Sequence, residues 1–306
     1  MNYKLMHHFF ILAIITCLYT PAQAIGVQIK QIEYHGWNGA WEISNGTVDL
    51  VVVPQIARIM RYGYVGERNV FWENPDLAGK TIDMNSKDWS NYGGDKIWNS
   101  PQIVWGWPPD NYLDAGPCKA EKLSGGRLKI TGKQSPLIGI RFSRIIQIAS
   151  SGTEVSIINE MKNLGNKPVE WGIWEVAQTD APLYGVLPRY RKSKFPLGLN
   201  DFATLGMTES DYSMTDTEIR LYHNTKIGMK AGIDSPEGWA KASWNNLHFT
   251  LSAAYQRGKR YPDDGCWQEL YAMNNPHYME LEILSPLYNL KPGASAAFTT
   301  RWKLTR

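Results

Sequence analysis

Short stretches that alternate apolar and polar residues, separated by turn residues, extend over most of this chain. In the segment from Ile29 to Arg61, one apolar stretch ends at Asn45-Gly46 and the next begins at Val48. Asn-Gly between two β-like stretches is a strong hairpin signal. No segment of ten or more residues has helical spacing. The pattern predicts about fifteen to twenty short strands, packed as a large antiparallel β-sandwich in a single domain over residues 25–306.

One long segment interrupts this rhythm. Residues 89–117 contain four tryptophans and two tyrosines, and Gly93-Gly94 and Pro108-Pro109 exclude a long helix. We therefore predict a loop that is too aromatic to be disordered. Its indole rings either stack on sugars, whose hydroxyl groups bond to the neighbouring charged and amide side chains, or plug one end of the β-structure. A second loop is predicted over residues 182–200, which are rich in proline and basic residues.

Residues 1–24 have the features of a secretory signal peptide. Lys4 supplies a positive charge, Phe9–Leu18 is apolar, and Ala22-Gln23-Ala24 is a small-residue cleavage site. The apolar stretch is too short to span a membrane, and no other segment is apolar enough. We expect cleavage after Ala24 and a periplasmic or secreted protein. The net charge of +3 is small and no basic cluster dominates, so nucleic acid is not an expected partner.

Two cysteines, Cys118 and Cys266, remain beyond the signal peptide. The sequence allows either a disulfide between them or two free thiols. Their spacing is not that of a metal site, and no histidine–cysteine cluster is present. We therefore expect no cofactor. A calcium ion is permitted, because carboxylate oxygens are its usual ligands. The carboxylates considered are Asp95, Asp110, Asp114, Asp263 and Asp264.

Three segments carry a family resemblance. Residues 43–74, with VVVPQIARI and NVFWEN, resemble the opening strands of galactose-mutarotase-like proteins, and residues 278–302, with LKPG, resemble their closing strands. The middle segment, NYGGDKIWNSPQIVWGWPPD followed by DAGP, resembles one branch of that superfamily, the DUF4380 family. Together these segments span residues 43–302, which is most of the chain beyond residue 24. The resemblance implies a β-supersandwich with a carbohydrate site on its concave face.

Aldose 1-epimerases of this superfamily use a carboxylate and a histidine as proton-transfer groups. Here the sequence departs from them, because WEVAQ (174–178) stands in place of the histidine motif. The candidate catalytic carboxylates are Glu175, Glu269 and Glu280. Glu280 and Glu282 are two residues apart in a predicted strand and therefore face the same side. They form either a carboxylate pair with one raised pKa or a polar stripe in solvent.

Further side chains around the aromatic segment are candidates for ligand binding. Arg58 lies between apolar neighbours, and its guanidinium suits a uronate, a sulfate or paired hydroxyl groups. Lys96 is able to orient or neutralise Asp95. The predicted substrate-binding residues are Arg58, Trp72, Asp95, Lys96, Trp98, Gln102, Trp107, Asp110 and Gln178.

The favoured hypothesis is an exported carbohydrate-binding protein whose partner is a sugar or glycan. One alternative is an enzyme, either a sugar epimerase or a glycan-cleaving activity, that uses a glutamate as base. Another is a non-enzymatic accessory protein whose aromatic segment contacts a second exported protein.

Overall fold

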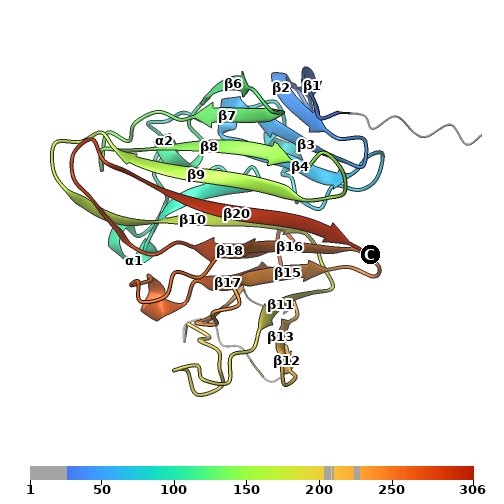
Figure 1. The fold of residues 1–306 in the computed structure, drawn as a ribbon, viewed down its shortest axis with the longest axis vertical. Helices are drawn as coiled ribbons and strands as arrows, with labels where there is room; N and C mark the ends of the chain where they lie inside the picture. Colours follow the sequence, from blue (N-terminus) through green and yellow to red (C-terminus); the bar gives the residue numbers. More distant parts are fainter. Residues whose placement is uncertain (1–25, 203–207, 209, 224–227) are drawn as a thin grey trace, which may run out of the picture.

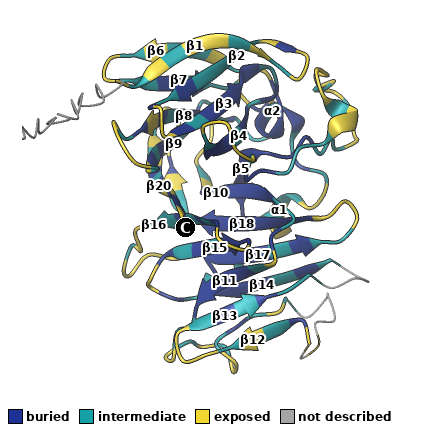
Figure 2. Cartoon of the chain, turned by 90° about the vertical axis from the view of Figure 1, so that its right-hand side faces the viewer, coloured by how far each residue is buried: buried dark blue, intermediate teal, exposed yellow. Residues whose placement is uncertain are grey.

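The computed structural model describes residues 26–202, 208, 210–223 and 228–306, which form two antiparallel sheets packed face to face (Figures 1 and 2). The predicted signal peptide, residues 1–24, lies outside the described residues. The first sheet has the order β1 (Gln28–Tyr34), β2 (Trp37–Ser44), β3 (Val48–Val53), β4 (Arg58–Tyr64), β5 (Asp95–Ser100), β10 (Val169–Asp180), β18 (Tyr278–Leu284), β17 (Gln268–Met273) and β14 (Met229–Ile233), with β19 (Tyr288–Leu290) paired to β10.

The second sheet has the order β12 (Tyr212–Met214), β13 (Glu218–Leu221), β11 (Tyr184–Pro188), β15 (Trp239–Ser243), β16 (His248–Ala253), β20 (Ser295–Thr305), β9 (Val155–Asn163), β8 (Ile140–Ile148), β7 (Arg127–Thr131) and β6 (Lys119–Leu123). In the described part of the chain, helical structure is limited to α1 (Gln102–Trp105), α2 (Asn111–Asp114) and the 3-10 turns η1 (Pro54–Ile56), η2 (Pro75–Leu77) and η3 (Asp263–Gly265). None of these helices is long and apolar enough to cross a membrane. The predicted all-β sandwich is confirmed.

The hairpin predicted at Asn45-Gly46 joins β2 to β3. The side-chain oxygen of Asn45 accepts hydrogen bonds from the backbone N–H groups of Thr47 and Val48, at 2.9 and 3.0 Å. Gly46 has φ +83°, a conformation that a side chain disfavours. The Asn45 amide also donates to the carbonyl of Ala149, at 2.9 Å, so the turn of the first sheet is tied to the second.

The aromatic segment is only partly the loop that we predicted. Asp95–Ser100 forms β5, a buried strand between β4 and β10 at the centre of the first sheet. The prediction was wrong here because β5 contains charged and amide residues, which strands buried on both faces seldom carry. Just before this strand the backbone at Gly93 passes close to the backbone of Trp72. A side chain would not fit there, because a Cβ at Gly93 would lie 2.1 Å from the carbonyl oxygen of Trp72.

The predicted loop over residues 182–200 also contains a strand. Residues Tyr184–Pro188 form β11, which pairs with β13 and β15. Pro188 occupies the last position of the strand, and a proline is tolerated at a strand end because no further ladder hydrogen bond from its nitrogen is needed. The remainder of the segment is a loop, as predicted.

The space between the sheets is filled largely by aromatic and branched side chains. Phe71 and Tyr62 of the first half of the chain pack against Phe249 and Trp302, with ring centroids 5.2 to 5.8 Å apart. Aromatic side chains bury large areas, so this cluster makes a major contribution to the attraction between the sheets.

A buried polar layer lies beside this cluster. The Glu175 carboxylate accepts hydrogen bonds from Trp302 Nε1 at 2.8 Å, from Asn159 at 2.7 Å and from Thr300 at 2.6 Å. Arg144 lies 3.6 Å from Glu175 and 2.5 Å from Asp95. Burial raises the pKa of Asp95 well above its usual range, and Arg144 opposes that effect. Glu175 and Asp95 therefore point between the sheets, where they connect β5 and β10 to the second sheet.

Replacement of Glu175 by alanine is expected to destabilise the protein by about 3–5 kcal/mol, because Arg144 and three other donors would lose a buried acceptor. Urea unfolding gives the free energy. Glu170→Ala, at an exposed glutamate on the same strand, is the matched control and should cost less than about 1 kcal/mol. Equal stability of the two variants would contradict the structural role assigned to Glu175.

Candidate functional site

A cavity of 330 Å³ lies on the first sheet, on the face turned away from the second sheet. Side chains alternate along β10, so Glu175 points between the sheets and Trp174 points to the opposite face. The residues that line the cavity are Trp89, Trp98, Gln102, Trp107, Trp174, Lys230, Tyr271, Met273, Tyr278, Glu280 and Glu282. Most come from the strands β5, β10, β14, β17 and β18, and the others come from the aromatic segment.

Strand register places the charged groups in two neighbouring rows. Across β5, β10, β18 and β17, the first row contains Lys96, Val176, Glu282 and Glu269. Across β10, β18, β17 and β14, the second row contains Gln178, Glu280, Tyr271 and Lys230. The side chains of each row lie on the same face of the sheet, because residues paired directly across antiparallel strands point the same way.

Each lysine in these rows is paired with carboxylates. Lys96 Nζ lies 3.2 Å from Glu280 Oε1, and Lys230 Nζ lies 2.7 Å from Glu269 and 3.0 Å from Glu282. Glu280 and Glu282 are 7% and 1% exposed, so they are not a stripe in open solvent. Such pairing is needed because an unpaired buried charge is costly.

Burial shifts the proton affinities of this cluster. It raises the pKa of Glu280, although Lys96 opposes the effect, and it raises the pKa of Glu269 well above the usual range, although Lys230 opposes that effect. Burial lowers the pKa of Lys96. For Lys230, burial alone would lower the pKa, but Glu269 and Glu282 outweigh it and raise the pKa. The site thus keeps Lys230 charged and holds carboxyl groups that gain a proton more readily than ordinary glutamates.

Four indole rings form the walls of the cavity. Trp89 and Trp98 lie edge to face with Trp107, with ring centroids 4.9 and 6.4 Å away, and Trp98 lies 5.2 Å from Trp174. Lysine ammonium groups lie over two of these rings, Lys96 at 4.8 Å from Trp98 and Lys230 at 4.6 Å from Trp174. Trp174 Nε1 also donates to Glu282 at 2.9 Å. The aromatic walls and the charged floor are therefore one connected structure.

Asp114, at the end of α2, holds two of the indole rings in place. Its carboxylate accepts hydrogen bonds from Trp98 Nε1 at 2.6 Å and from Trp89 Nε1 at 3.2 Å. Arg58 from β4 pairs with the same carboxylate at 2.8 Å. Arg58, Asp114 and Trp98 are buried, and Trp89 is partly exposed. The chain's DAGP motif thus supplies a buried anchor for the wall of the cavity.

The structure brings some of the predicted site residues together. Trp98, Gln102, Trp107 and Glu280 line the cavity, while Lys96 and Glu269 pair with lining residues. Trp72 and Gln178 lie at one edge, where both are next to Tyr278.

Other predicted site residues lie elsewhere. Asp95 and Glu175 are in the polar layer between the sheets, and Arg58 lies behind the indole rings on Asp114. Asp110 caps α2, where its carboxylate accepts from the N–H of Tyr112 at 2.9 Å. These groups do not line the cavity.

Sequence reasoning missed five residues that line the cavity, Trp174, Lys230, Tyr271, Met273 and Tyr278. Lys230 had a signal, because it is a single charged residue between Met229 and Ala231 in a short strand. Its partners Glu269 and Glu282 are remote in sequence, so the pattern alone did not reveal the charged cluster to which Lys230 belongs.

Cys118 and Cys266 are free thiols, so the structure contains no disulfide between them. Within the described ranges, no group of three or more histidine, cysteine, aspartate or glutamate side chains is arranged to hold a metal ion. Asp95 and Asp114, considered above as calcium ligands, are instead paired with arginines.

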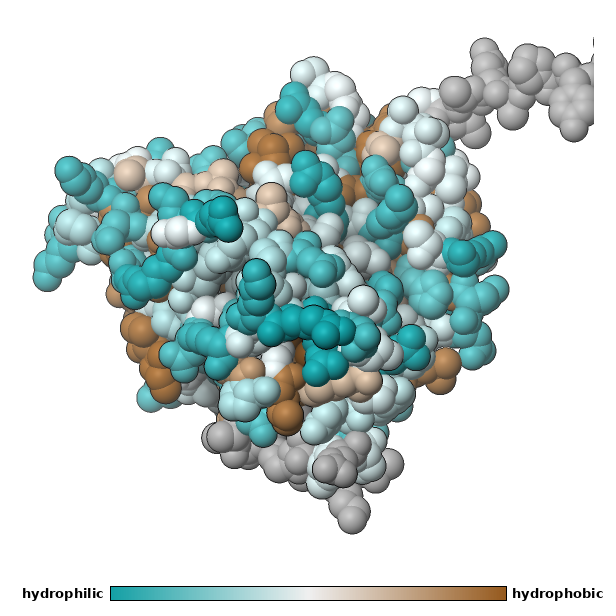
Figure 3. Space-filling model, turned by 60° about the horizontal axis from the view of Figure 1, so that its bottom comes forward, coloured by the Kyte–Doolittle hydropathy of each residue, from teal (hydrophilic) through white to brown (hydrophobic). Residues whose placement is uncertain are grey.

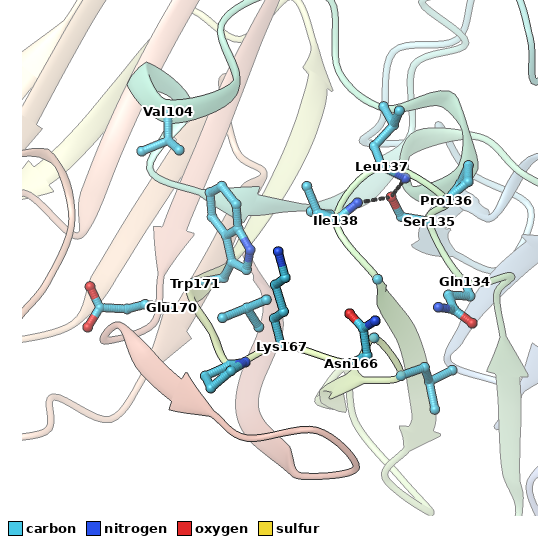
Figure 4. A pocket seen from close by; sticks show the side chains of 15 residues that line it. Val104, Gln134, Ser135, Pro136, Leu137, Ile138, Asn166, Lys167, Glu170 and Trp171 are labelled. Atoms are coloured by element: carbon cyan, nitrogen blue, oxygen red, sulfur yellow. Dashed lines mark hydrogen bonds between the residues drawn. The ribbon is translucent and has the colours of Figure 1, made fainter.

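A second hollow, of 700 Å³, borders α1 at Val104 (Figure 4). Trp171 and Lys167 lie side by side near its centre, with Val104 of α1 on one side. Its charged residues, Lys167 and Glu170, are exposed, in contrast to the buried pairs of the first cavity. On the face shown in Figure 3, hydrophilic side chains predominate and hydrophobic ones form small separate groups. The tryptophan-lined cavity is therefore the better candidate for a site.

The fold is shared with several solved structures. A TPR-domain containing protein from Parabacteroides distasonis has a TM-score of 0.59 and 14% identity, over 87% of this chain and 47% of that one. A galactose mutarotase related enzyme from Lactobacillus acidophilus has a TM-score of 0.58 and 7% identity, over 87% of this chain and 97% of that one. A galactose mutarotase-like protein from Lactobacillus casei has a TM-score of 0.58 and 11% identity, over 87% of this chain and 100% of that one. This chain spans about half of the Parabacteroides protein.

These similarities show that the chain shares the β-sandwich fold of galactose-mutarotase-like proteins, and at such low identity they concern the fold alone. The model of the family described as domain of unknown function (DUF4380) matches residues 40–305, and the chain belongs to this family. The resemblance seen in the sequence is confirmed. No curated protein matches the chain.

Asp114→Asn is expected to loosen the indole wall and to lower stability by about 3–5 kcal/mol, because the buried Arg58 would lose its charge partner. Near-UV circular dichroism should change, because Trp89 and Trp98 use different oxygens of Asp114 and an amide keeps only one of them, so one indole N–H loses its acceptor. Asp88→Asn, at an exposed aspartate directly before the aromatic segment, is the control and should stay within about 0.5 kcal/mol. A near-UV spectrum unchanged in Asp114→Asn would contradict the anchoring role.

Proposed function

We propose that this protein is an exported carbohydrate-binding protein and that a sugar or glycan occupies the tryptophan-lined cavity. The observation that carries the proposal is the meeting of four indole rings with buried hydrogen-bonding groups around one hollow of 330 Å³. Small-molecule sites have volumes of about 300–1,000 Å³ and combine apolar walls with a few fixed polar groups. Export rests on the predicted signal peptide over residues 1–24.

The chemistry of the walls suits a saccharide. The C–H face of a sugar ring packs against an indole face, and Trp107, 56% exposed, offers such a face at the mouth of the cavity. Hydroxyl groups need donors and acceptors, which Gln102, Tyr271, Tyr278 and Glu280 supply. The names of the similar structures, a galactose mutarotase related enzyme and a galactose mutarotase-like protein, support a sugar as the ligand.

Trp107→Ala is expected to weaken binding of the cognate glycan by about tenfold, because truncating an aromatic side chain that packs on the ligand costs more than about 1 kcal/mol. A glycan array identifies the ligand, and isothermal titration calorimetry then measures affinity. Trp239→Ala, at a partly exposed tryptophan on β15 of the other sheet, is the matched control and should bind normally. Unchanged affinity in Trp107→Ala would remove this cavity from the site, and an array without hits together with a co-purifying protein would favour the accessory function.

Enzymatic action on the sugar is a second candidate, favoured by one observation. Glu280 faces the cavity beside Lys96, and burial raises the pKa of its carboxyl group. A carboxyl group with a raised pKa gives and takes protons more readily than an ordinary glutamate, which is the property that a general acid–base catalyst needs. Glu269 lies behind Lys230 and is fully buried, so Glu280 is the better candidate for direct contact with a sugar.

If the protein is a sugar epimerase, Glu280→Gln is expected to slow interconversion of the sugar's anomers by roughly 10²–10⁴-fold. Polarimetry or NMR follows the reaction, and glutamine retains an oxygen that can accept from Lys96. Glu121→Gln, at a surface glutamate on β6, should leave the rate unchanged. No rate above buffer for any aldose would exclude epimerase chemistry and leave carbohydrate binding.

A further inference from the structure

The charges of the cavity limit the kind of saccharide that fits, and this inference rests on the proposed carbohydrate function. The cluster contains three carboxylates, Glu269, Glu280 and Glu282, and two ammonium groups, Lys96 and Lys230. Both ammonium groups are already paired, at 2.7 to 3.2 Å. No lysine of this cluster is therefore left to neutralise an anionic ligand such as a uronate, a sulfate or a phosphate.

One carboxylate of the cluster, that of Glu280, has an oxygen that is accessible from the cavity and has no hydrogen-bond partner among the described residues. The side chain of Glu280 is 9% exposed, compared with 1% for Glu282 and 0% for Glu269. Its Oε1 accepts from Lys96, whereas Oε2 has no hydrogen-bond partner among the described residues. Since Glu280 lines the cavity, this oxygen is a free acceptor for a ligand.

The aromatic walls add to the attraction for a cation. Lysines already lie over the rings of Trp98 and Trp174, at 4.8 and 4.6 Å. Over the part of the chain that the structure describes, no cation lies over Trp89 or Trp107, which are edge to face with centroids 4.9 Å apart. The face of an aromatic ring carries negative potential and attracts ammonium groups.

We propose that the cavity binds a saccharide that carries a protonated amino group, with the ammonium received by Glu280 and the rings of Trp89 and Trp107. One of the three N–H donors of an ammonium group bonds to the free oxygen of Glu280, the aromatic faces attract its charge, and the sugar ring packs against the remaining aromatic surface. A neutral sugar of the same shape lacks the charge, and an anionic one meets the surplus carboxylate.

Binding of the amine is coupled to protonation of Glu280. The groups that face Glu280 are Lys96 of β5, Gln178 of β10, Tyr271 of β17 and both Tyr278 and Glu282 of β18, with Lys230 of β14 beyond. Burial raises the pKa of Glu280, so part of the free protein carries the neutral acid near that pKa. An ammonium ligand favours the ionised form, so its affinity rises as the pH increases through that pKa, and binding releases a proton.

Calorimetry with four probes tests the proposal on the full-length mature protein: glucosamine, glucose, glucuronate and choline, with the galacto series in parallel. The amino sugar should bind at least about tenfold more tightly than the neutral sugar, and the uronate most weakly. At a pH near the pKa of Glu280 and below that of the amine, titrations in buffers of different ionisation enthalpy should show proton release for the amino sugar and none for the neutral one.

The double variant Lys96→Met with Glu280→Gln removes both members of the buried pair, so no lone buried charge remains. It should reduce the preference for the amino sugar to within about twofold. The matched control, Lys303→Met with Glu154→Gln, removes an exposed pair 3.1 Å apart and should keep the preference. A preference retained in the Lys96–Glu280 variant would overturn the assignment to Glu280.

The outcomes separate this proposal from the carbohydrate function on which it rests. Equal affinity for neutral and amino sugars, or tightest binding of the uronate, would overturn the amine proposal and leave carbohydrate binding intact. Binding of choline without any sugar would contradict both the carbohydrate function and the amino-sugar proposal, because choline has no N–H donor for Glu280, and would leave only attraction of a cation by the aromatic rings. No binding of any probe, in either sugar series, would overturn both.

Discussion

Five ionisable side chains crowd one face of the first sheet, and the structure holds them there by pairing each ammonium group with carboxylates. Lys96 pairs with Glu280, and Lys230 bridges Glu269 and Glu282. Isolated charges in such a place would be strongly destabilising. The pairing fixes the positions of β5, β14, β17 and β18 relative to one another and holds two indole rings against lysine ammonium groups, so the cavity and the sheet depend on the same contacts.

Strand alternation divides the charged residues of the first sheet into two groups with different roles. On β5, Asp95 points between the sheets and the adjacent Lys96 points to the cavity; on β10, Glu175 and Trp174 divide in the same way. The inner group joins the two sheets through Arg144 and Asn159. The outer group meets a hollow with aromatic walls. Adjacent residues of one strand therefore serve structure on one face and, in our proposal, ligand binding on the other.

The strand pattern, the Asn45-Gly46 hairpin and the sandwich were predictable because they depend on local alternation and turn chemistry. Trp98, Lys96 and Glu280 were named because aromatic and charged residues stand out in a sequence. Which face of the sheet each side chain occupies depends on strand register. The sequence therefore could not show that Asp95 and Glu175 face the second sheet while Trp98, Lys96 and Glu280 face the cavity side. β5 was missed because its charges are compensated by residues far away in the chain, among them Arg144 and Glu280. Lys230 was missed for the same reason.

The most direct test of the central claim, that paired charges and indole rings build a saccharide site on the outer face of β5, β10 and β18, is a crystal structure of the protein soaked with an amino sugar. The account predicts a sugar ring against Trp107 with its nitrogen within hydrogen-bonding distance of Glu280 Oε2. A sugar bound only in another hollow, such as the one beside Trp171, with the tryptophan-lined cavity holding water alone, would contradict it.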